Sequence, residues 1–423
     1  MDYRRRAIDS ELDALLPDLA AIAIRGARGV GKTETALQRA RTVYRLDDSA
    51  VREIVAASPA RLCEGESPIL IDEWQAFPSS WDVVRRAVDA DRSPGRFLLT
   101  GSASPRNPPT HTGAGRIVQL RMRPMTFAER GLERPTVSLA GLLSGSTSAV
   151  GGRTATRVDG YADAILSSGF PGVLGLPDRA IKAQLDGYVD QLVERDFEEA
   201  GESIRRPALL RRWIAAYAAA ISSVTSFEKI RIAASGTGGD PPAKATAQRY
   251  VDVLESTWVI DPIPAWAPTG GELRRLALSP KHQLVDPALA ARLRRVTIDA
   301  LLRGQPAGDL NPRHLTLFGA LFEAAVTMNV RVDAQAAGGS AFHFRERNGT
   351  HEVDLVVEGP DGRIVAIEVK ATQAVGDADV RHLVWLRERI GERLAAAVIV
   401  TTGPEAYRRR DGVDVVPAAL LGP

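Results

Sequence analysis

Eight consecutive residues near the amino end of the chain have the types and the spacing of a phosphate-binding loop. Residues 26–33 satisfy the pattern GxxxxGK[ST], follow an apolar run at residues 21–24 and lead into a helical stretch. Glycines let backbone N–H groups surround phosphate oxygens, and the start of the helix adds its positive dipole. We therefore expect Lys32 to contact the β- and γ-phosphates of ATP and Thr33 to offer its hydroxyl to Mg²⁺. The predicted nucleotide-binding residues are Gly26, Ala27, Arg28, Gly29, Val30, Gly31, Lys32, Thr33, Glu34 and Asp72.

A second motif lies at the end of another apolar run, residues 69–71. It consists of Asp72 and Glu73, the carboxylate pair of a Walker B strand. Asp72 would hold Mg²⁺ through water, and Glu73 would polarise the attacking water. A third run, residues 97–99, precedes Ser102, which we expect near the γ-phosphate, although a hydroxyl there is also a common helix cap. The alternative is a glycine-rich turn and an unrelated acidic strand end, which would have to occur in this order by chance.

Six short motifs make the chain resemble the AAA+ class of P-loop ATPases. They are residues 71–75, 96–102, 115–116, 123–127, 169–171 and 194–196. Within that class the chain resembles a prokaryotic family in which such a module precedes a domain of uncharacterised function with a nuclease-like end, and the resemblance covers essentially the whole chain. It implies that the sensor strand lies between the Walker A and Walker B strands. It also implies that Arg116 acts on the nucleotide of a neighbouring subunit in a homo-oligomer. Ala27, often proline in the family, and Gly172, often acidic, depart from the pattern without touching phosphate chemistry.

The last hundred residues contain a carboxylate and lysine cluster whose geometry follows from a hairpin. Residues 360–362 suit a three-residue loop with Gly362 in the left-handed conformation. In that register Val357 pairs with Val365, Leu355 with Ile367 and Val353 with Val369, which gives one apolar face. On the other face Asp354 stands opposite Glu368, and Lys370 lies on the same side.

This cluster resembles the core of PD-(D/E)XK nucleases, in which acidic residues hold Mg²⁺ and a lysine positions water. The resemblance implies that Asp354 and Glu368 are metal ligands, that Glu323 on a preceding helix supports them, and that Lys370 orients the water. With Thr33 and Asp72 these make up the predicted metal-binding residues. The predicted catalytic residues are Glu73, Ser102, Arg116 and Lys370. The alternative is a salt-bridge cluster on a solvated sheet face, and a metal site would not by itself establish cleavage.

The middle of the chain resembles a winged-helix domain. Residues 226–234 and 243–255 are typical of two short helices joined by a glycine-rich turn, and residues 258–264 are typical of the strand that enters a wing. The second helix would present Lys244, Thr246, Gln248 and Arg249 to a DNA groove. The alternative is a packing or oligomerisation module, because Asp252 and Glu255 dilute the positive charge.

The composition of the chain limits which classes of protein and of site are possible. With 423 residues, of which 44% are hydrophobic, the chain is too long for one core, and its net charge of +2 gives little support for a nucleic-acid partner. The single cysteine, Cys63, excludes an internal disulfide and a cysteine-rich zinc site. No apolar run approaches the length of a membrane span, so we expect a cytoplasmic protein without a membrane partner. Only six of the 54 basic residues are lysines, so each lysine is informative, and Lys32 and Lys370 fall inside chemical motifs.

These observations predict three α/β or helical parts. We expect an AAA+ ATPase domain at residues 1–135, a helical and winged-helix region at residues 136–310, and a nuclease-like α/β domain at residues 311–423, with residues 138–153 as a loose linker. ATP and Mg²⁺ are the expected cofactors, and DNA is the expected partner. Three hypotheses remain open: an ATP-dependent nuclease, an ATP-gated DNA-binding switch with an inactive nuclease fold, and a remodeller of partner proteins.

Overall fold

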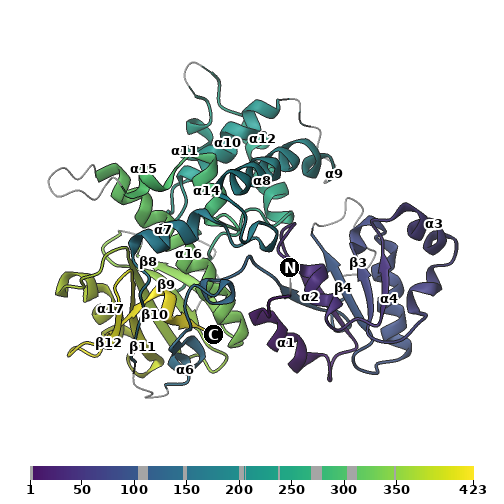
Figure 1. The fold of residues 1–423 in the computed structure, drawn as a ribbon, viewed down its shortest axis with the longest axis horizontal. Coiled ribbons are helices and arrows are strands. Elements are labelled where there is room, and N and C mark those ends of the chain that lie inside the picture. The colour runs from purple at the N-terminus through teal and green to yellow at the C-terminus, as the bar shows by residue number, and fades with distance from the viewer. Residues whose placement is uncertain are drawn as a thin grey trace.

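The computed structural model describes residues 3–102, 113–145, 150–199, 204, 206–236, 239–267, 279–302, 312–346 and 349–423. Three bodies can be followed in Figure 1: an N-terminal α/β domain, a helical middle domain, and a C-terminal domain built on a second sheet. The chain starts between the first body and the other two, and it ends beside α6 and α16 of the third. One continuous apolar core joins all three bodies, because residues of each belong to the same buried cluster.

The N-terminal domain is built on a five-stranded parallel sheet. Its strands are β1 (Ala21–Arg25), β2 (Thr42–Arg45), β3 (Ile69–Asp72), β4 (Phe97–Gly101) and β5 (Val118–Arg121). Their spatial order is β2-β3-β4-β1-β5. The predicted position of the sensor strand β4, between β1 and β3, is therefore confirmed. In a parallel sheet all carboxyl ends share one edge, so the P-loop, Asp72 and Thr100 meet there.

Side-chain alternation buries both faces of this sheet. Ile22 and Ile24 belong to the core shared with the rest of the molecule, whereas Ala21 and Ala23 belong to a separate cluster with Trp74. The helices of the domain are α1 (Ala7–Leu15), α2 (Lys32–Leu37), α3 (Ser49–Ala57) and α4 (Ser79–Ala90). Because period-two alternation sends successive residues to opposite faces, the sheet is covered on both sides.

The middle domain is helical, as predicted. Its helices are α7 (Val158–Leu166), α8 (Asp178–Gln191), α9 (Phe197–Glu199), α10 (Pro207–Ala219), α11 (Phe227–Ala233), α12 (Lys244–Ser256), α14 (Pro287–Leu293) and α15 (Ile298–Leu302), and a π-helical turn, Leu192–Asp196, follows α8. After α12, two antiparallel bridges, Ile260 with Leu284 and Ile263 with Lys281, form a short ribbon. We call residues 259–266 and 279–285 the ribbon. Of the helices that the structure describes, none has both the length and the apolar composition of a membrane span.

The C-terminal domain contains a seven-stranded mixed sheet in the order β7-β12-β13-β11-β10-β9-β8. The strands are β7 (Gly152–Arg153), β8 (Ser340–Arg345), β9 (Glu352–Glu358), β10 (Ile364–Lys370), β11 (Leu394–Thr401), β12 (Glu405–Arg408) and β13 (Asp414–Pro417). The long helix α16 (Pro312–Ala336) precedes the sheet, and α17 (Asp377–Ile390) connects β10 to the parallel strand β11. A helix, an antiparallel three-stranded meander, a helix and a parallel strand thus follow one another.

The predicted hairpin register is confirmed over most of its length. Val365 pairs with Val357 and Ile367 with Leu355, and Gly362 is left-handed with φ 78°. The predicted place of Val353 on the same apolar face is wrong, because Val353 packs against Phe344 on the opposite side. The cause is a register shift between β8 and β9, where two residues of β9 stand opposite His343. Such a bulge turns the strand, and bulges often lie beside functional sites.

The described parts of the segment expected to be a loose linker, residues 138–145 and 150–153, are instead bound to the C-terminal domain. Strand β6 (Val137–Ser138) pairs in parallel with β14 (Leu421–Gly422), and β7 pairs with β12. Between them, α6 (Leu139–Leu143) buries its leucines in the shared core. Short strands of two residues leave too little periodicity for a sequence pattern to reveal them.

A largely buried charge cluster joins the three bodies at one point. Asp261 of the ribbon contacts Arg123, Arg331 and Arg121 at 2.8, 3.0 and 3.7 Å between nitrogen and oxygen. Arg121 ends β5, Arg123 follows it, and Arg331 belongs to α16. The Arg121 guanidinium also lies over the Trp258 ring, 3.8 Å from its centroid. Burial would raise the pKa of Asp261, but the three guanidinium groups hold that pKa far below its ordinary range.

Candidate functional site

The P-loop is shaped by glycines that no other residue could replace without strain. Gly29 and Gly31 adopt positive φ angles of 80° and 100°, and Gly31 is the cap from which α2 begins. At Gly26 an added Cβ would lie 2.1 Å from the Met122 carbonyl oxygen, because the loop leaves β1 directly beside the residue that follows β5. The loop therefore has the conformation that lets its backbone surround phosphate oxygens.

Lys32 is held ready above the loop. Its side chain is buried and its ammonium donates to the carbonyl oxygens of Gly26 at 3.0 Å and Ala27 at 2.9 Å. Burial lowers the pKa of Lys32 to about 8, although Glu73 and Asp72 nearby partly oppose that shift. A phosphate oxygen is a stronger acceptor for an ammonium than a carbonyl oxygen, so Lys32 can exchange these two bonds for nucleotide contacts.

The predicted magnesium pair is brought together. The Thr33 hydroxyl donates to Asp72 Oδ1 at 2.8 Å, and the Thr100 hydroxyl donates to the same oxygen. Asp72 ends β3, and Thr33 lies in the first turn of α2. Thr100 belongs to β4, the strand between β3 and β1. A hydroxyl and a carboxylate at this spacing fit Mg²⁺, which takes one or two protein oxygens and completes its shell with water and phosphate. Mg²⁺ bound here would neutralise charge on the β- and γ-phosphates.

Glu73 lies beside this pair in a strained backbone conformation. Its φ is 52°, which is unusual for a residue with a side chain. The Ser102 hydroxyl donates to Glu73 Oε2 at 3.3 Å, and the Gln75 amide donates to the same oxygen. Glu73 and Ser102 therefore lie together, and their assigned roles at the attacking water and the γ-phosphate stay predictions. Gln75, the last residue of the motif at residues 71–75, thus helps to fix the Glu73 side chain.

The middle domain touches the P-loop directly. Arg28 donates to Asp196 Oδ1 of the π-helical turn at 2.9 Å, and a Cβ on Gly31 would lie 3.4 Å from Pro171. Two motifs far apart in the sequence, residues 169–171 and 194–196, thus meet the phosphate-binding loop. A cavity of about 790 Å³ opens beside α2, and Glu34 lines it with the N-terminal residue Tyr3 and with Gly172. Its size suits the base and ribose of a nucleotide.

Arg116 lies away from this site. It precedes β5, at the edge of the sheet opposite the carboxyl ends of the parallel strands, and its Nε donates to Asp89 at 2.8 Å. Within one chain the P-loop therefore lies at the carboxyl ends of the parallel strands, and Arg116 lies at their amino ends. Arg116 would therefore reach a nucleotide only in a neighbouring subunit, which is the role predicted for it.

The C-terminal carboxylates converge, but a lysine that sequence reasoning missed lies among them. Lys281 of the ribbon is 2% exposed, and its ammonium lies 2.8 Å from Glu323, 3.0 Å from Asp354 and 3.5 Å from Glu352. Burial would lower the pKa of Lys281, but Asp354 and Glu323 raise it well above its ordinary value. Lys281 is one of only six lysines, and that rarity was the signal available in the sequence.

The remaining groups of the predicted metal site are also paired. Asp354 Oδ2 accepts from the Val369 backbone N–H at 3.0 Å, at the point where the ladder between β9 and β10 stops. Lys370 donates to Glu368 Oε1 at 2.8 Å, while Glu368 Oε2 is buried without a hydrogen-bond partner. Burial first, and then the charge of Asp354, raise the pKa of Glu368.

A divalent metal does not fit this arrangement. Across the parts of the chain that the structure describes, no three His, Cys, Asp or Glu side chains are arranged to hold one metal ion. The ammonium of Lys281 lies where such an ion would contact Asp354 and Glu323. The assignment of Glu323, Asp354 and Glu368 as metal ligands, and of Lys370 as the group that positions water, stays a prediction.

Three family models match parts of the chain. Residues 19–131 match the AAA domain, residues 158–300 match the domain of unknown function DUF8612, and residues 318–421 match the domain of unknown function DUF4143. The N-terminal domain thus matches an AAA-type P-loop domain over most of its length, which supports nucleotide binding at this site. The match to DUF4143 covers the C-terminal sheet without assigning an activity to it.

Full-length relatives and solved structures add little about activity. Two uncharacterized proteins, one from Mycobacterium bovis and one from Mycobacterium tuberculosis, are each 28% identical to this chain over 429 residues, which is 99% of this chain and 84% of each relative. A solved structure of the Aeropyrum pernix ORC2 protein aligns with 68% of this chain and 92% of its own at 14% identity. Its TM-score of 0.24 is too low to support an argument.

Proposed function

We propose that this protein hydrolyses ATP to change the contact between its middle domain and its P-loop, and that it acts on DNA through the middle domain. The observation that carries the proposal is the set of groups at one edge of the parallel sheet. Lys32, the Thr33–Asp72 pair and Glu73 supply the phosphate contact, the metal ligands and the water-polarising carboxylate that phosphoryl transfer needs.

The contact between Arg28 and Asp196 supports the coupling. Arg28 lies inside the loop that surrounds the phosphates, and its guanidinium is partly exposed while the Asp196 carboxylate is buried. Phosphate charge close to Arg28 competes with Asp196 for the guanidinium, so binding and release of the γ-phosphate would alter this bridge. Domain closure around a nucleotide and its release after hydrolysis are a common way to couple the two events.

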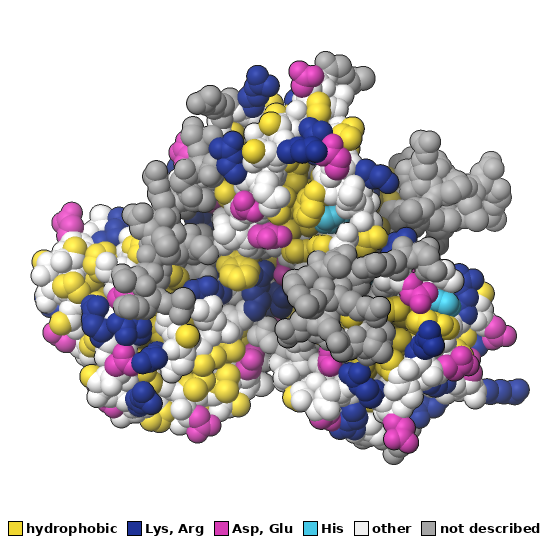
Figure 2. Space-filling model, turned by 180° about the vertical axis from the view of Figure 1, so that it is seen from behind, with side chains coloured by type: hydrophobic (Ala, Val, Ile, Leu, Met, Phe, Trp, Pro, Cys, Tyr) yellow, Lys and Arg dark blue, Asp and Glu magenta, His cyan; other side chains and the backbone are white. Residues whose placement is uncertain are grey.

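The exposed face of α12 supports DNA as the partner. Lys244, Gln248 and Arg249 are exposed on this helix, which is the helix after α11 in the chain, the order that a helix-turn-helix unit has. Asp252 lies on the same face and accepts a hydrogen bond from Gln248. On the molecular face seen in Figure 2, basic side chains are interspersed with acidic and apolar ones. DNA would therefore be held by a local surface and not by the net charge.

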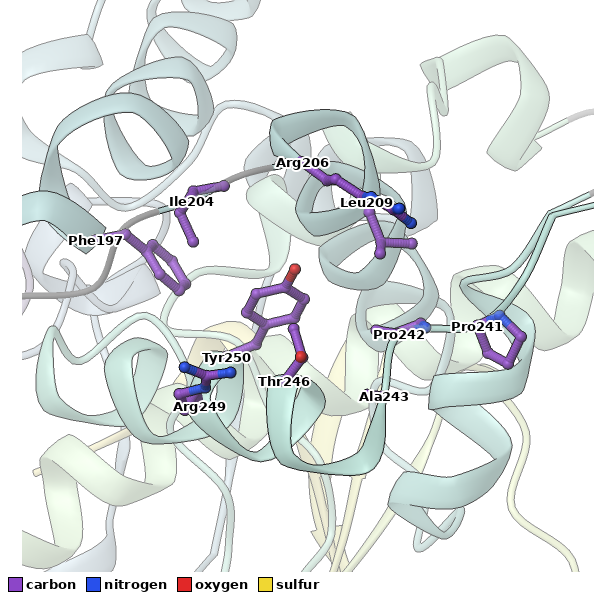
Figure 3. Close-up of a pocket in the computed structure, with 10 residues that line it drawn as sticks. All are labelled: Phe197, Ile204, Arg206, Leu209, Pro241, Pro242, Ala243, Thr246, Arg249 and Tyr250. Carbon is purple, nitrogen blue, oxygen red and sulfur yellow. The ribbon is translucent and has the colours of Figure 1, made fainter.

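A cavity beside α12 extends this surface. It has a volume of about 590 Å³, an apolar floor that includes Phe197 and Leu209, and the guanidinium groups of Arg206 and Arg249 in its lining (Figure 3). Tyr250 projects into it from α12 (Figure 3). Aromatic and apolar groups next to guanidinium groups suit an unstacked base with its phosphate. The cavity thus favours distorted or single-stranded DNA over a regular duplex.

DNA binding by α12 can be tested through its charge. We expect Lys244→Ala and Arg249→Ala each to weaken DNA binding by about tenfold and to lower the salt dependence of the affinity by about one unit. Asp252→Asn should strengthen binding, because it removes a negative charge from the same face. Fluorescence anisotropy with single-stranded, forked and duplex oligonucleotides, with and without ATP, measures these effects.

The matched control is Lys182→Ala, which removes a lysine from the exposed pair with Asp178 on α8. It should leave DNA affinity unchanged. Equal affinities for the wild type and all α12 variants would exclude α12 as the DNA surface. Absence of any DNA binding in every nucleotide state would favour the remodeller of partner proteins.

Arg116 offers a test of assembly. Arg116→Ala and Lys32→Ala chains should each be inactive, whereas their mixture should recover part of the turnover, because one interface then combines an intact P-loop with an intact arginine. Arg85→Ala is the control, since Arg85 pairs with the same Asp89 at 2.9 Å and should not affect turnover. Full phosphate release by Arg116→Ala, or by a strictly monomeric wild type, would remove this role.

A metal-dependent nuclease is the second candidate function. The favourable observation is that Glu323, Asp354 and Glu368 come from a helix, a bulged strand and its neighbour, and lie close together. The unfavourable observation is the ammonium of Lys281 between Glu323 and Asp354. Of the hypotheses drawn from the sequence, the ATP-gated switch with an inactive nuclease fold is therefore the better supported.

A further inference from the structure

The acidic cluster of the C-terminal domain needs a nearby positive charge to remain folded. Glu323, Glu352 and Asp354 bring three carboxylates together, with Glu368 close by. Their side chains range from 33% exposed for Glu352 to 8% for Glu368. Carboxylates at this spacing repel one another and lose hydration, so the folded chain needs a cation among them.

Lys281 provides that cation, and its ammonium donates hydrogen bonds to Glu323 and Asp354 and forms an ion pair with Glu352. An ammonium has three donors, and three carboxylates lie within 3.5 Å of this one. The acceptors come from α16 and β9, whereas the lysine comes from the ribbon of the middle domain. The contact therefore closes an interface between two bodies, and each side is incomplete without the other.

The backbone around Lys281 fixes the ammonium in place. Lys281 exchanges two backbone hydrogen bonds of 2.9 Å with Ile263 across the ribbon. The ribbon is attached to the edge strand β8, because Trp266 N–H donates to the His343 carbonyl oxygen at 2.6 Å and His343 N–H donates to Pro264. The His343 ring also contacts the Ser279 carbonyl oxygen at 3.0 Å. The backbone network thus holds the ribbon against β8, and the burial of the Lys281 side chain, which is 2% exposed, keeps its ammonium among the carboxylates.

We infer that Lys281 is a built-in replacement for a divalent metal ion in this cluster. It neutralises the carboxylates, excludes Mg²⁺ and Mn²⁺ by charge and by occupying their position, and locks the ribbon onto the C-terminal sheet. The C-terminal domain is then a metal-independent element whose acidic site serves to hold the middle domain. This inference goes beyond the proposed ATP and DNA functions and does not depend on them.

The test measures Mn²⁺ binding to the full chain without nucleotide, by electron paramagnetic resonance of free Mn²⁺ and by thermal melting. The wild type should bind no Mn²⁺ at this cluster. Its Mn²⁺ binding should therefore be the same as that of Asp354→Asn. Lys281→Ala should melt at a lower temperature, gain a Mn²⁺ site and recover several degrees on Mn²⁺ addition, and the second substitution Asp354→Asn should abolish that gain. Comparison through Asp354→Asn separates this site from Mn²⁺ held by Thr33 and Asp72.

Two controls define the result. Lys281→Arg keeps the positive charge and should stay insensitive to Mn²⁺, and Lys182→Ala removes an exposed lysine and should behave as the wild type. Mn²⁺ binding to the wild type that depends on Asp354 would overturn the inference, as would a folded Lys281→Ala chain without a Mn²⁺ response. If Lys281→Ala does not fold, the Mn²⁺ titration of the wild type still decides whether the cluster excludes the metal. The double variant Lys281→Met with Glu323→Gln then replaces Lys281→Ala, because it removes one charge of each sign.

Discussion

Glu73→Gln is expected to keep ATP binding and to lower turnover by about 10²- to 10⁴-fold, the usual contribution of a positioned base. The substitution preserves the shape of the side chain, so the contacts from Ser102 and Gln75 and the left-handed backbone can persist. What is lost is the negative charge that polarises water. Nucleotide affinity, measured with a fluorescent ATP analogue, should stay within a few-fold of the wild type.

Lys32→Ala should give the opposite pattern. It removes the ammonium that reaches the phosphates, so both affinity and turnover should fall. Glu53→Gln is the matched control, because Glu53 is an exposed carboxylate on α3 of the same domain. It should change neither quantity. Normal turnover by Glu73→Gln would show that another group polarises the water, and equal loss of binding in both variants would mean that Glu73 supports the fold of the site.

Asp261→Asn is expected to produce the largest loss of stability, about 3–5 kcal/mol, the range for breaking a buried charge cluster. The carboxylate is the common partner of Arg121, Arg123 and Arg331, so its neutralisation leaves three largely buried guanidinium groups without their shared counter-charge. Because these arginines come from two bodies and the aspartate from a third, we expect the three parts to unfold less cooperatively. Urea unfolding followed by circular dichroism and by tryptophan fluorescence measures both effects.

The control for this prediction is Asp178→Asn, which breaks an exposed pair with Lys182 and should change stability by less than about 1 kcal/mol. The pH dependence supplies a second check. Since the folded pKa of Asp261 is depressed, its contribution is present above the unfolded pKa of about 3.9 and is lost as the pH falls below it. The difference between the wild type and Asp261→Asn should therefore shrink in acid. A constant difference would assign the effect to packing.

The sequence predicted the N-terminal domain well because its signals are local. The P-loop and the Walker B pair each lie at the end of an apolar run, so motif and strand confirmed one another. Strand β5 was missed, since its four residues, Val118–Arg121, alternate without a strongly apolar run. Its role in placing Arg121 at the ribbon depends on a pairing with β1 that no local pattern contains.

The C-terminal cluster shows where local reasoning ends. Turn chemistry fixed the register near Gly362, and that register held as far as Leu355. The bulge beyond it depends on how β9 meets β8, which the hairpin alone does not determine. Lys281 lies 73 positions from Asp354, so only the folded chain brings them together. Its rarity as a lysine could have marked it, but nothing in the sequence named its partners.

The pairing of β6 and β7 with the last strands has a consequence for synthesis. Arg153 of β7 contacts Glu405, 252 positions later in the chain. At a translation rate of about 5–20 residues per second, the segment waits roughly ten to fifty seconds for its partners. During that time the P-loop domain can fold on the ribosome, while α6 leaves its leucines uncovered next to two strand edges. This interval is when the nascent chain is most exposed to chaperones and to aggregation, and it lasts until β12 and β14 have been synthesised and can pair with β7 and β6.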